Sequence, residues 1–310
     1  MSDELPSDLR PVADFFGLPG PEPVAKDFAV LRAIRTLVEI DAAPFTLVFG
    51  GGTALARAHK LVQRMSEDVD FKIIPTAAAA VSRSGLRRQR SVLRDRVTAA
   101  LQAAGFAFDS GDAVRSRDEN SYTIFQLPYM AGGAGEGLRP TIQIELKHTT
   151  LRLPRVTLPV SSFVAEALNL APEVPTIACV STTETAAEKL VSLTRRTAMD
   201  LAGLSRDFDP ALVRHLYDLH ILRGHVDRGT VIVLARDIAA SDADEFRNQY
   251  PAYHADIAGE TRKALDALRT DPMHRERYDR FVAIMVYGER VEFDEAVRTV
   301  ADLVGDAWTA

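Results

Sequence analysis

The sequence is poor in cysteine, in tryptophan and in surplus positive charge. Its 310 residues include one cysteine and one tryptophan, and the formal net charge is −6. A single thiol, Cys179, excludes an internal disulfide and a zinc site built on cysteines. The acidic balance argues against a chain that is coated with positive charge for binding nucleic acid.

Long hydrophobic runs are also missing. No apolar run approaches the roughly 20 residues that a helix needs to cross a bilayer, and the N-terminal residues MSDELPSDLR are acidic, unlike those of a signal peptide. We therefore expect a cytoplasmic protein with no membrane partner. Hydrophobic residues make up 46% of the chain, a content typical of globular proteins, and its length allows two domains.

The most informative stretch is residues 45–73, FTLVFGGGTALARAHKLVQRMSEDVDFKI. It begins with an apolar run that predicts a buried strand. Three glycines follow at 50–52, and Thr53 then opens an amphipathic run, Ala54–Val62, that predicts a helix. Glycines after a strand let backbone N–H groups approach a triphosphate closely, and a following helix N-terminus favours anions.

Two aspartates follow this predicted helix. Asp68 and Asp70 alternate with Val69 and Phe71, so on a strand both carboxylates lie on one face. Mg²⁺ typically takes one or two protein carboxylates together with waters and substrate phosphate oxygens. Each half of the stretch has a simpler interpretation, a glycine turn or a solvated acidic strand. The two halves in sequence favour a phosphate and metal site.

GGT, a short helix and SEDVDF together resemble the signature of DNA polymerase β-type nucleotidyltransferases. The closer resemblance is to the AbiEii/MenT branch, toxins of bacterial toxin–antitoxin pairs, and it extends to about Asp218. It implies an α/β fold, with an N-terminal nucleotidyltransferase mixed sheet, flanking helices and a C-terminal helical bundle. The expected parts are an N-terminal arm (1–23), the nucleotidyltransferase domain (24–160) and a mainly helical C-terminal domain (161–310).

A further strand is predicted at Thr141–His148, TIQIELKH. Its isoleucines and leucine lie on one face, and Glu145 lies on the other with Gln143 and Lys147. By itself Glu145 is equally well explained as an exposed glutamate of an edge strand. The resemblance implies instead that it completes the metal site with the two aspartates and helps to deprotonate the acceptor hydroxyl.

The second half carries two further motif residues. Ser181–Glu184 predicts a capping box that begins a helix. The resembled family has a lysine in A-x-E-K-L-x-x-L and an aspartate in R-x-x-Y-D-L, which here read AAEKLVSL and RHLYDL. These motifs give Lys189 and Asp218, while His215 departs from the usual form. Without the resemblance, both would be taken as residues on solvated helix surfaces.

The resemblance distributes roles over these residues. It makes Asp68, Asp70 and Glu145 the metal ligands and Lys189 a neutraliser of phosphate charge. Asp218 then orients either Lys189 or the nucleotide. Ser66 occupies the position at which one toxin subgroup is phosphorylated, although a plain turn serine explains it as well. The catalytic set is Asp68, Asp70, Glu145, Lys189 and Asp218, and the nucleotide-binding set is Gly51, Gly52, Thr53, Ser66, Lys189 and Arg195.

An arginine-rich segment stands out against the acidic background. Residues 82–96, SRSGLRRQRSVLRDR, carry six arginines and one acid, within a predicted helix over 77–104 that breaks around Gly85. Arginine suits phosphate backbones, although a solvated helix whose arginines pair with acids elsewhere explains the pattern too. We expect RNA contact from Arg83, Arg87, Arg88, Arg90 and Arg94.

The remaining chain is read from its periodicity. Residues 1–23 contain five prolines and predict an irregular arm. Two or three antiparallel strands are expected between 105 and 130, with turns at 110–112 and 117–120, and a flexible loop at 131–137. Predicted helices span 24–40, 161–168, 181–201, 210–222, 230–240, 253–268, 274–286 and 293–303, the last three packing as a bundle, and a strand spans 176–180.

The function implied by the resemblance is transfer of a nucleoside monophosphate from a nucleoside triphosphate, with Mg²⁺, to an RNA acceptor. For this branch the acceptor is the tRNA 3′ end, the donor is a pyrimidine nucleotide, and a cognate antitoxin is the partner. Two other classes stay open: a transferase with a small-molecule (aminoglycoside-like) or protein acceptor, and a non-catalytic nucleotide-binding protein.

Overall fold

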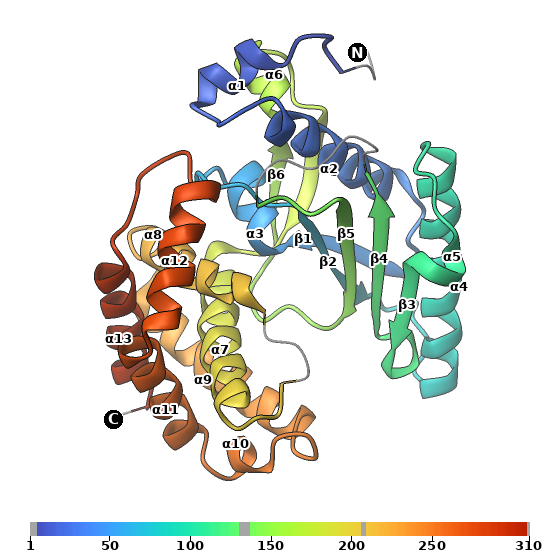
Figure 1. Cartoon of the computed structure of the whole chain (residues 1–310). Coiled ribbons are helices and arrows are strands. Elements are labelled where there is room, and N and C mark those ends of the chain that lie inside the picture. Colours follow the sequence, from blue (N-terminus) through green and yellow to red (C-terminus); the bar gives the residue numbers. More distant parts are fainter. Residues whose placement is uncertain (1–4, 130–136, 206–208, 309–310) are drawn as a thin grey trace. The chain divides into compact units, whose positions relative to one another are not determined.

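The computed structural model of the chain describes residues 5–129, 137–205 and 209–308 and divides into two compact units, Met1–Val180 and Ser181–Ala310 (Figure 1). The expected flexible loop at 131–137 lies almost wholly outside the described residues. Within the part of the chain that is described, no helix has the length and apolar character needed to cross a membrane.

The first unit contains a mixed sheet of seven strands in the order β3-β4-β5-β2-β1-β7-β6. Two neighbouring pairs, β2–β5 and β1–β7, are parallel, and the other neighbours are antiparallel. The strands are β1 (Phe45–Gly50), β2 (Asp68–Pro75), β3 (Val114–Arg117), β4 (Tyr122–Pro128), β5 (Thr141–His148), β6 (Val156–Val160) and β7 (Val174–Cys179). The expected mixed sheet with flanking helices is confirmed.

The boundary between the units lies at Val180/Ser181 rather than after residue 160. The reason is pairing: β7 runs parallel to β1, and β6 pairs antiparallel with β7, so both strands belong to the first sheet. The strand β6 was not expected. Four of its five residues are exposed or half-buried and it contains Pro159, as edge strands often do.

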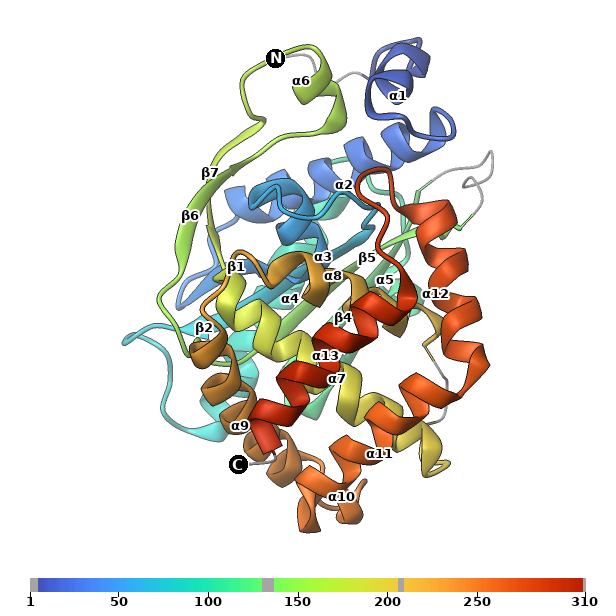
Figure 2. The ribbon, with the colours of Figure 1, turned by 90° about the vertical axis from the view of Figure 1, so that its left-hand side faces the viewer.

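The two faces of the sheet differ sharply. Alternate residues of β2 and β5 form one core with α2 (Glu22–Glu39) and α4 (Arg83–Ala103), and α2 lies against both β2 and α4 (Figure 2). We call this the helix-covered face. The other residues of β2 and β5, which include Asp68, Asp70 and Glu145, point the opposite way, and we call that side the carboxylate face. Core residues of the helix-covered face are Val69, Phe71, Ile73, Ile142, Ile144 and Leu146.

The five prolines of the N-terminal arm predicted an irregular structure, but the arm is helical. It contains α1 (Arg10–Phe16), and α2 begins at Glu22. In both helices a proline stands in the first turn, where its missing N–H costs nothing because that group has no intrahelical partner. The arm packs on α6 (Phe163–Ala167), with the rings of Phe16 and Phe163 4.6 Å apart. The prolines therefore begin helices here instead of preventing them.

Two helix boundaries differ from expectation. The helix after the glycines is α3 (Gly51–Thr53), continued by a π-helical turn at Ala54–Ala58, so it ends before the predicted Val62. The helix α4 begins at Arg83, and Ser82 caps it by accepting a hydrogen bond from the N–H of Gly85. Gly85 thus lies in the first turn of α4, and the helix is not broken there, contrary to the prediction. The expected turns at 110–112 and 117–120 are the one-turn helix α5 (Ser110–Ala113) and the 3₁₀ turn Asp118–Asn120.

The second unit is helical, as expected. Its longest helix, α7 (Thr182–Leu201), contacts α8 (Arg214–Leu222), α9 (Arg228–Glu245) and α11 (Ile257–Thr270). The helix predicted over 253–268 is divided into α10 (Pro251–Ala255) and α11, because the Asp256 carboxylate accepts from the N–H of Gly259 and begins a new helix. The predicted packing of the last helices is confirmed by contacts among α11, α12 (Pro272–Met285) and α13 (Phe293–Trp308).

Candidate active site

Strand register places the predicted carboxylates of the first unit side by side. In the parallel pair β2–β5, Asp70 is opposite Glu145 and Asp68 is opposite Gln143. All three carboxylates are half-buried on the carboxylate face. Two residues that lie 75 positions apart in the chain thus become neighbours on adjacent strands, which are about 4.8 Å apart.

The turn at residues 50–52 requires glycine because other side chains pack directly against its backbone. Gly51 has φ +69°, and a Cβ there would overlap the Oδ2 atom of Asp70. A Cβ on Gly52 would overlap the guanidinium of Arg64 and lie 3.1 Å from the Oγ atom of Ser66. Positive φ and close approach both favour glycine. The turn therefore brings its backbone directly against an aspartate of the candidate site.

Thr53 differs from its expected role. The side chain is completely buried, and its hydroxyl lies 2.9 Å from the Oγ atom of Ser66 and also contacts the carbonyl oxygen of Asp68. The hydroxyl is therefore engaged inside the protein, where it fixes the beginning of β2 against the glycine turn. A nucleotide contact at Thr53 would have to come from its backbone. Ser66 is half-buried, and its hydroxyl is hydrogen-bonded to that of Thr53.

A charged network that was not predicted holds Asp68 in place. The guanidinium of Arg139 contacts the Asp68 carboxylate, and its Nε lies 3.0 Å from Oε1 of Glu67. Glu67 in turn lies 3.1 Å from the ammonium of Lys26, which also donates to the carbonyl oxygens of Arg139 and Thr141 at 2.7 Å. Burial lowers the pKa of Lys26, and the adjacent Glu67 carboxylate opposes that shift. The motif residue Glu67 thus serves as an internal anchor.

The sequence did contain a signal for this network. On α2 the buried positions include Val24, Lys26, Asp27 and Val30, so two charged residues fall within the apolar stripe. A charged residue within such a stripe predicts a buried partner of opposite charge. The partners themselves come from a distant segment, and the sequence pattern does not identify them.

Both oxygens of Glu145 are hydrogen-bonded. The side-chain amide of Gln143 donates to Oε1 at 2.6 Å, and the phenol of Tyr122 donates to Oε2 at 2.7 Å. Burial raises the pKa of Tyr122, and the carboxylates of Glu145 and Asp70 raise it further. Tyr122 therefore keeps its proton across the physiological range and acts as a fixed donor that orients Glu145.

Mg²⁺ takes oxygen ligands, of which one or two are protein carboxylates. Among the residues described, no three acidic, histidine or cysteine side chains are gathered so that they could hold a metal ion. Asp68 is paired with Arg139, and Glu145 is bonded to Tyr122 and Gln143. Asp68 and Asp70 nevertheless share one strand face beside the backbone of Gly51, and two carboxylates suffice when substrate oxygens complete the shell. These two aspartates fit Mg²⁺.

In the second unit the two predicted motif residues are in contact. The ammonium of Lys189 on α7 lies 2.8 Å from Oδ2 of Asp218 on α8, and these side chains are 9% and 0% exposed. The imidazole Nδ1 of His215 lies 3.3 Å from the carbonyl oxygen of Lys189. Burial lowers the pKa of His215 well below its usual value, and the Lys189 ammonium adds to this. The expected proximity of Lys189 and Asp218 is present, and their roles stay predictions.

Arg195, the other predicted nucleotide contact on α7, is used for packing. Its Nε lies 2.9 Å from Oδ2 of Asp242, and its guanidinium lies 4.2 Å from the centre of the Phe246 ring. Both contacts lie within the second unit and connect α7 to α9 and the residue that follows it. Arg195 therefore stabilises the helical unit through an ion pair and a cation–π contact.

The arginine-rich helix lies on the wrong side of the sheet for the carboxylates. The helix α4 packs on the helix-covered face, and three of the five arginines make internal contacts. Arg83 pairs with the Glu119 carboxylate at 2.7 Å, and Arg90 donates to the Glu119 carbonyl at 3.1 Å. Arg94 pairs with Asp95. The sheet thus separates the predicted RNA-binding arginines from Asp68, Asp70 and Glu145, and only Arg87 and Arg88 of this set are exposed with no hydrogen bond or ion pair among the described contacts.

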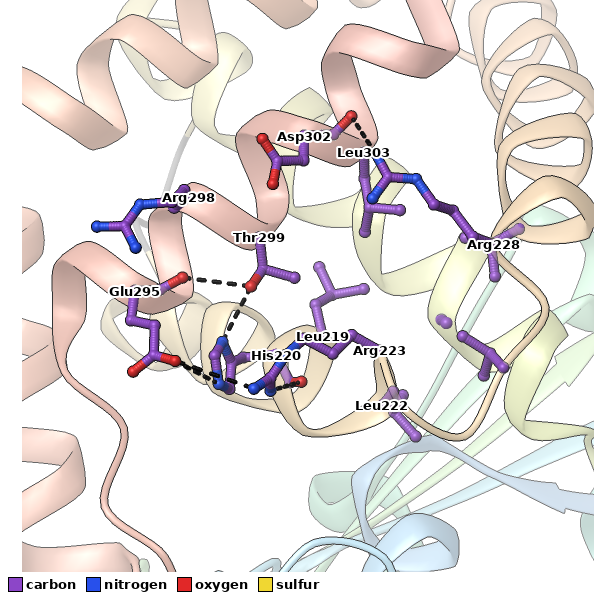
Figure 3. Close-up of a pocket in the computed structure, with 13 residues that line it drawn as sticks. Leu219, His220, Leu222, Arg223, Arg228, Glu295, Arg298, Thr299, Asp302 and Leu303 are labelled. Atoms are coloured by element: carbon purple, nitrogen blue, oxygen red, sulfur yellow. Dashed lines mark hydrogen bonds and ion pairs between the residues drawn. The ribbon is translucent and has the colours of Figure 1, made fainter.

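The second unit also contains a cavity of about 260 Å³ that involves α8, α9 and α13 (Figure 3). Polar groups in it pair with one another: Nδ1 of His220 lies 2.9 Å from Oγ1 of Thr299, and Nε2 of His220 lies 3.5 Å from the Glu295 carboxylate. Arg228 pairs with the carboxylate of Asp306. Neither Lys189 nor Asp218 lines this cavity, so it is separate from the predicted motif residues.

Residues 35–299 match a family model described as the nucleotidyl transferase AbiEii toxin of a type IV toxin–antitoxin system. Among solved structures the chain is similar to MenT4, a nucleotidyltransferase toxin from Mycobacterium tuberculosis H37Rv. That match has 16% sequence identity and a TM-score of 0.47, and it covers 96% of this chain and 97% of that chain. A comparison with curated proteins gives no match.

Proposed function

The chain belongs to the AbiEii family of nucleotidyltransferase toxins of type IV toxin–antitoxin systems, and from this premise we propose that it adds a nucleotide to the 3′ end of tRNA. The donor in this proposal is a pyrimidine nucleoside triphosphate, Mg²⁺ is the cofactor, and pyrophosphate is released. The reaction takes place in the cytoplasm, and a cognate antitoxin restrains it.

One observation supports the proposal most strongly. Asp70 and Glu145 are opposite each other on parallel strands, Asp68 shares their face, and the Gly51 backbone packs directly on Asp70. A backbone N–H turn beside paired carboxylates is what a metal–triphosphate complex requires, because the amides bind phosphate oxygens while the carboxylates bind the cation.

Asp68 and Asp70 are the residues that would hold Mg²⁺, and the bound ion supplies Lewis acidity and a template for in-line displacement. Glu145 accepts the proton of the acceptor hydroxyl in this account. Its two hydrogen bonds, from Tyr122 and Gln143, fix its orientation and leave a second lone pair on each oxygen. Arg139 and Glu67 hold the backbone and side chain at Asp68.

In the second unit, Lys189 is proposed to neutralise charge that develops on the phosphates. The neighbouring Asp218 carboxylate lies 2.8 Å from the ammonium of Lys189 and limits its rotamers. His215 stays neutral beside it because burial lowers its pKa. A neutral residue at this position adds no competing positive charge next to the ammonium of Lys189.

The direct test uses the purified full chain with Mg²⁺, total tRNA and each labelled nucleoside triphosphate in turn. We expect label to enter tRNA from one pyrimidine nucleotide, to be lost in Asp68→Ala, to stop on chelation and to return when Mg²⁺ is restored. If label appears only in a small molecule or a protein, the acceptor is that molecule and not tRNA. Absence of transfer from every nucleotide would refute the transferase proposal for this chain.

Ser66 is proposed as a control point of the same site. It lies two residues before Asp68, and its hydroxyl is hydrogen-bonded to the buried Thr53 hydroxyl. A phosphate there would add roughly −1.5 to −2 charges beside the aspartates and disfavour binding of a triphosphate. We expect Ser66→Asp to lose transfer and Ser66→Ala to retain most of it, and full activity in Ser66→Asp would remove this idea.

A further inference from the structure

A row of basic side chains lies next to the carboxylates on the same face of the sheet. In the register of adjacent strands, Lys72 of β2 is opposite Lys147 of β5, Lys147 is opposite Tyr122 of β4, and Tyr122 is opposite Arg117 of β3. Residues opposite one another point to the same face. The hydrogen bond from Tyr122 to Glu145 identifies that side as the carboxylate face. We call Lys72, Lys147 and Arg117 the basic row.

The basic row is adjacent to the candidate site. Lys72 follows Asp70 by two residues on β2, and Lys147 follows Glu145 by two residues on β5. Two residues of strand correspond to about 7 Å. Arg117 is near enough to Tyr122 to oppose the upward shift of the phenol pKa, which burial causes first. The cations therefore lie one side-chain row away from the groups proposed to carry out the reaction.

Two of the three positive charges in this row are not balanced by an ion pair among the described residues. Lys147 and Arg117 are exposed, and no ion pair among the described residues involves either of them. Like charges directly opposite each other on neighbouring strands, as Lys72 and Lys147 are, destabilise a sheet. By contrast, Arg83, Arg90 and Arg94 of α4 all have partners. Exposed cations that lie in no ion pair among the described residues, as Lys147 and Arg117 do, indicate a surface that receives an anion.

We propose that the basic row binds backbone phosphates of the acceptor RNA and so selects a polyanionic acceptor over a cationic small molecule. This inference rests on the proposed function and specifies its acceptor. The acceptor and the donor are proposed to bind on opposite sides of Asp70. The glycine turn adjoins Asp70 from the β1 side, whereas the row runs from β2 towards the β3 edge over about 14 Å. The row therefore leads away from the turn proposed to hold the donor triphosphate.

The test measures tRNA binding without any nucleotide as a function of salt concentration. Each cation lost from a single-stranded contact lowers the slope of log K against log salt by about 0.7. We expect Lys147→Gln with Arg117→Gln to lower the slope by about 1.4. The matched control, Arg87→Gln with Arg88→Gln on α4, changes the net charge equally and should leave the slope unchanged. Thermal unfolding of each double variant checks that it is folded.

Two further readings distinguish the sources of phosphate. The KM for the nucleoside triphosphate should be unchanged in the row variant. A raised KM with an unchanged tRNA slope would assign the row to the donor and overturn the inference. A slope lowered by the α4 control instead, or by neither variant, would also overturn it. If the wild-type chain binds tRNA with the expected slope but transfers no nucleotide, the proposed function fails while the row is upheld.

Discussion

The two faces of the sheet in the first unit both carry positive charge, but they use it differently. On the helix-covered side, arginines that lie close together in sequence are held by Asp95 and by the carboxylate and backbone carbonyl of Glu119. On the carboxylate face, Lys72, Lys147 and Arg117 come from three separate segments, and strand register alone puts them in one row. Clustering in the sequence and clustering in space therefore point to different surfaces.

The same contrast extends to the acids. Carboxylates next to α4 serve as partners for arginines, as Glu119 and Asp95 do. On the carboxylate face, by contrast, the three carboxylates occupy neighbouring positions of two parallel strands, where Tyr122 and Gln143 orient Glu145 and Arg139 holds Asp68. Placing like charges together has an electrostatic cost, and functional sites are where such costs are commonly found.

The largest predicted effect separates the two faces through their acids. Asp70→Asn keeps the size of the side chain but removes its charge. We expect transfer to fall by at least about 10³-fold, since the proposed Mg²⁺ would supply several kcal/mol. Asp95→Asn on α4 is the matched control and should retain full transfer. Rates are measured with labelled nucleotide at saturating tRNA. Equal losses in both variants would show that the faces are not functionally distinct.

The glycine turn gives the next effect. Gly51→Ala would place a Cβ against the Asp70 carboxylate at positive φ, and we expect about a 10²-fold loss of transfer because the aspartate must move. Gly17 has a similar φ of +66° and nothing within 4 Å of an added Cβ. Gly17→Ala should therefore cost only about 1 kcal/mol of stability, from backbone strain, and leave transfer intact.

A smaller effect tests the structural role of the α4 arginines. Arg90 is 7% exposed and donates to the Glu119 carbonyl, so Arg90→Ala should lower the free energy of unfolding by about 2 kcal/mol through lost packing and an unpaired carbonyl. The exposed Arg87→Ala should change it by less than about 0.5 kcal/mol. Urea unfolding measures both. A strong transfer defect in folded Arg90→Ala would contradict a purely structural role.

The last prediction concerns pH and the helix α2, which packs on the helix-covered face. Burial raises the pKa of Asp27 to about 6, although the nearby Arg57 guanidinium opposes the shift. A carboxyl group that binds its proton more tightly when folded stabilises the protein below pH ~4, and this stabilisation is lost as pH rises to about 6. Relative to Asp27→Asn, the wild type should lose up to about 3 kcal/mol over that range.

The difference in unfolding free energy between the wild type and Asp27→Asn isolates the effect of Asp27, because the other carboxylates titrate over the same pH range in both proteins. It is obtained from unfolding free energies of the two proteins at matched pH values. A difference that stays constant, or that grows in favour of the wild type as pH rises, would contradict the shift. Arg57 is present in both proteins and so does not enter the difference except through its contact with Asp27, which is 2.9 Å long.

Local patterns in the sequence predicted the carboxylates well. Alternation in DVDF and in TIQIELKH was enough to place Asp68, Asp70 and Glu145 on strand faces, because side-chain direction on a strand has a strict period of two. A capping serine and apolar spacing likewise predicted α7, which begins after Ser181. These features depend on contacts between residues near one another in the chain.

The features that were missed depend on contacts over long sequence distances. Tertiary packing determines which face of the sheet α4 covers. Helix periodicity therefore did not show that the α4 arginines lie away from the carboxylates. The partners of Lys26 lie more than forty positions away in the chain. The Thr53 hydroxyl is buried because the chain returns to it at Ser66. The basic row exists only through the order β3-β4-β5-β2.

The most direct test of the two-face account is ultraviolet cross-linking of tRNA to the full chain, followed by mass spectrometry of the cross-linked peptides. The account predicts cross-links within residues 114–128 and 141–148, on the strands that carry the basic row and Glu145. Cross-links confined to residues 83–103 of α4 would contradict it, because the acceptor would then bind the face opposite the carboxylates.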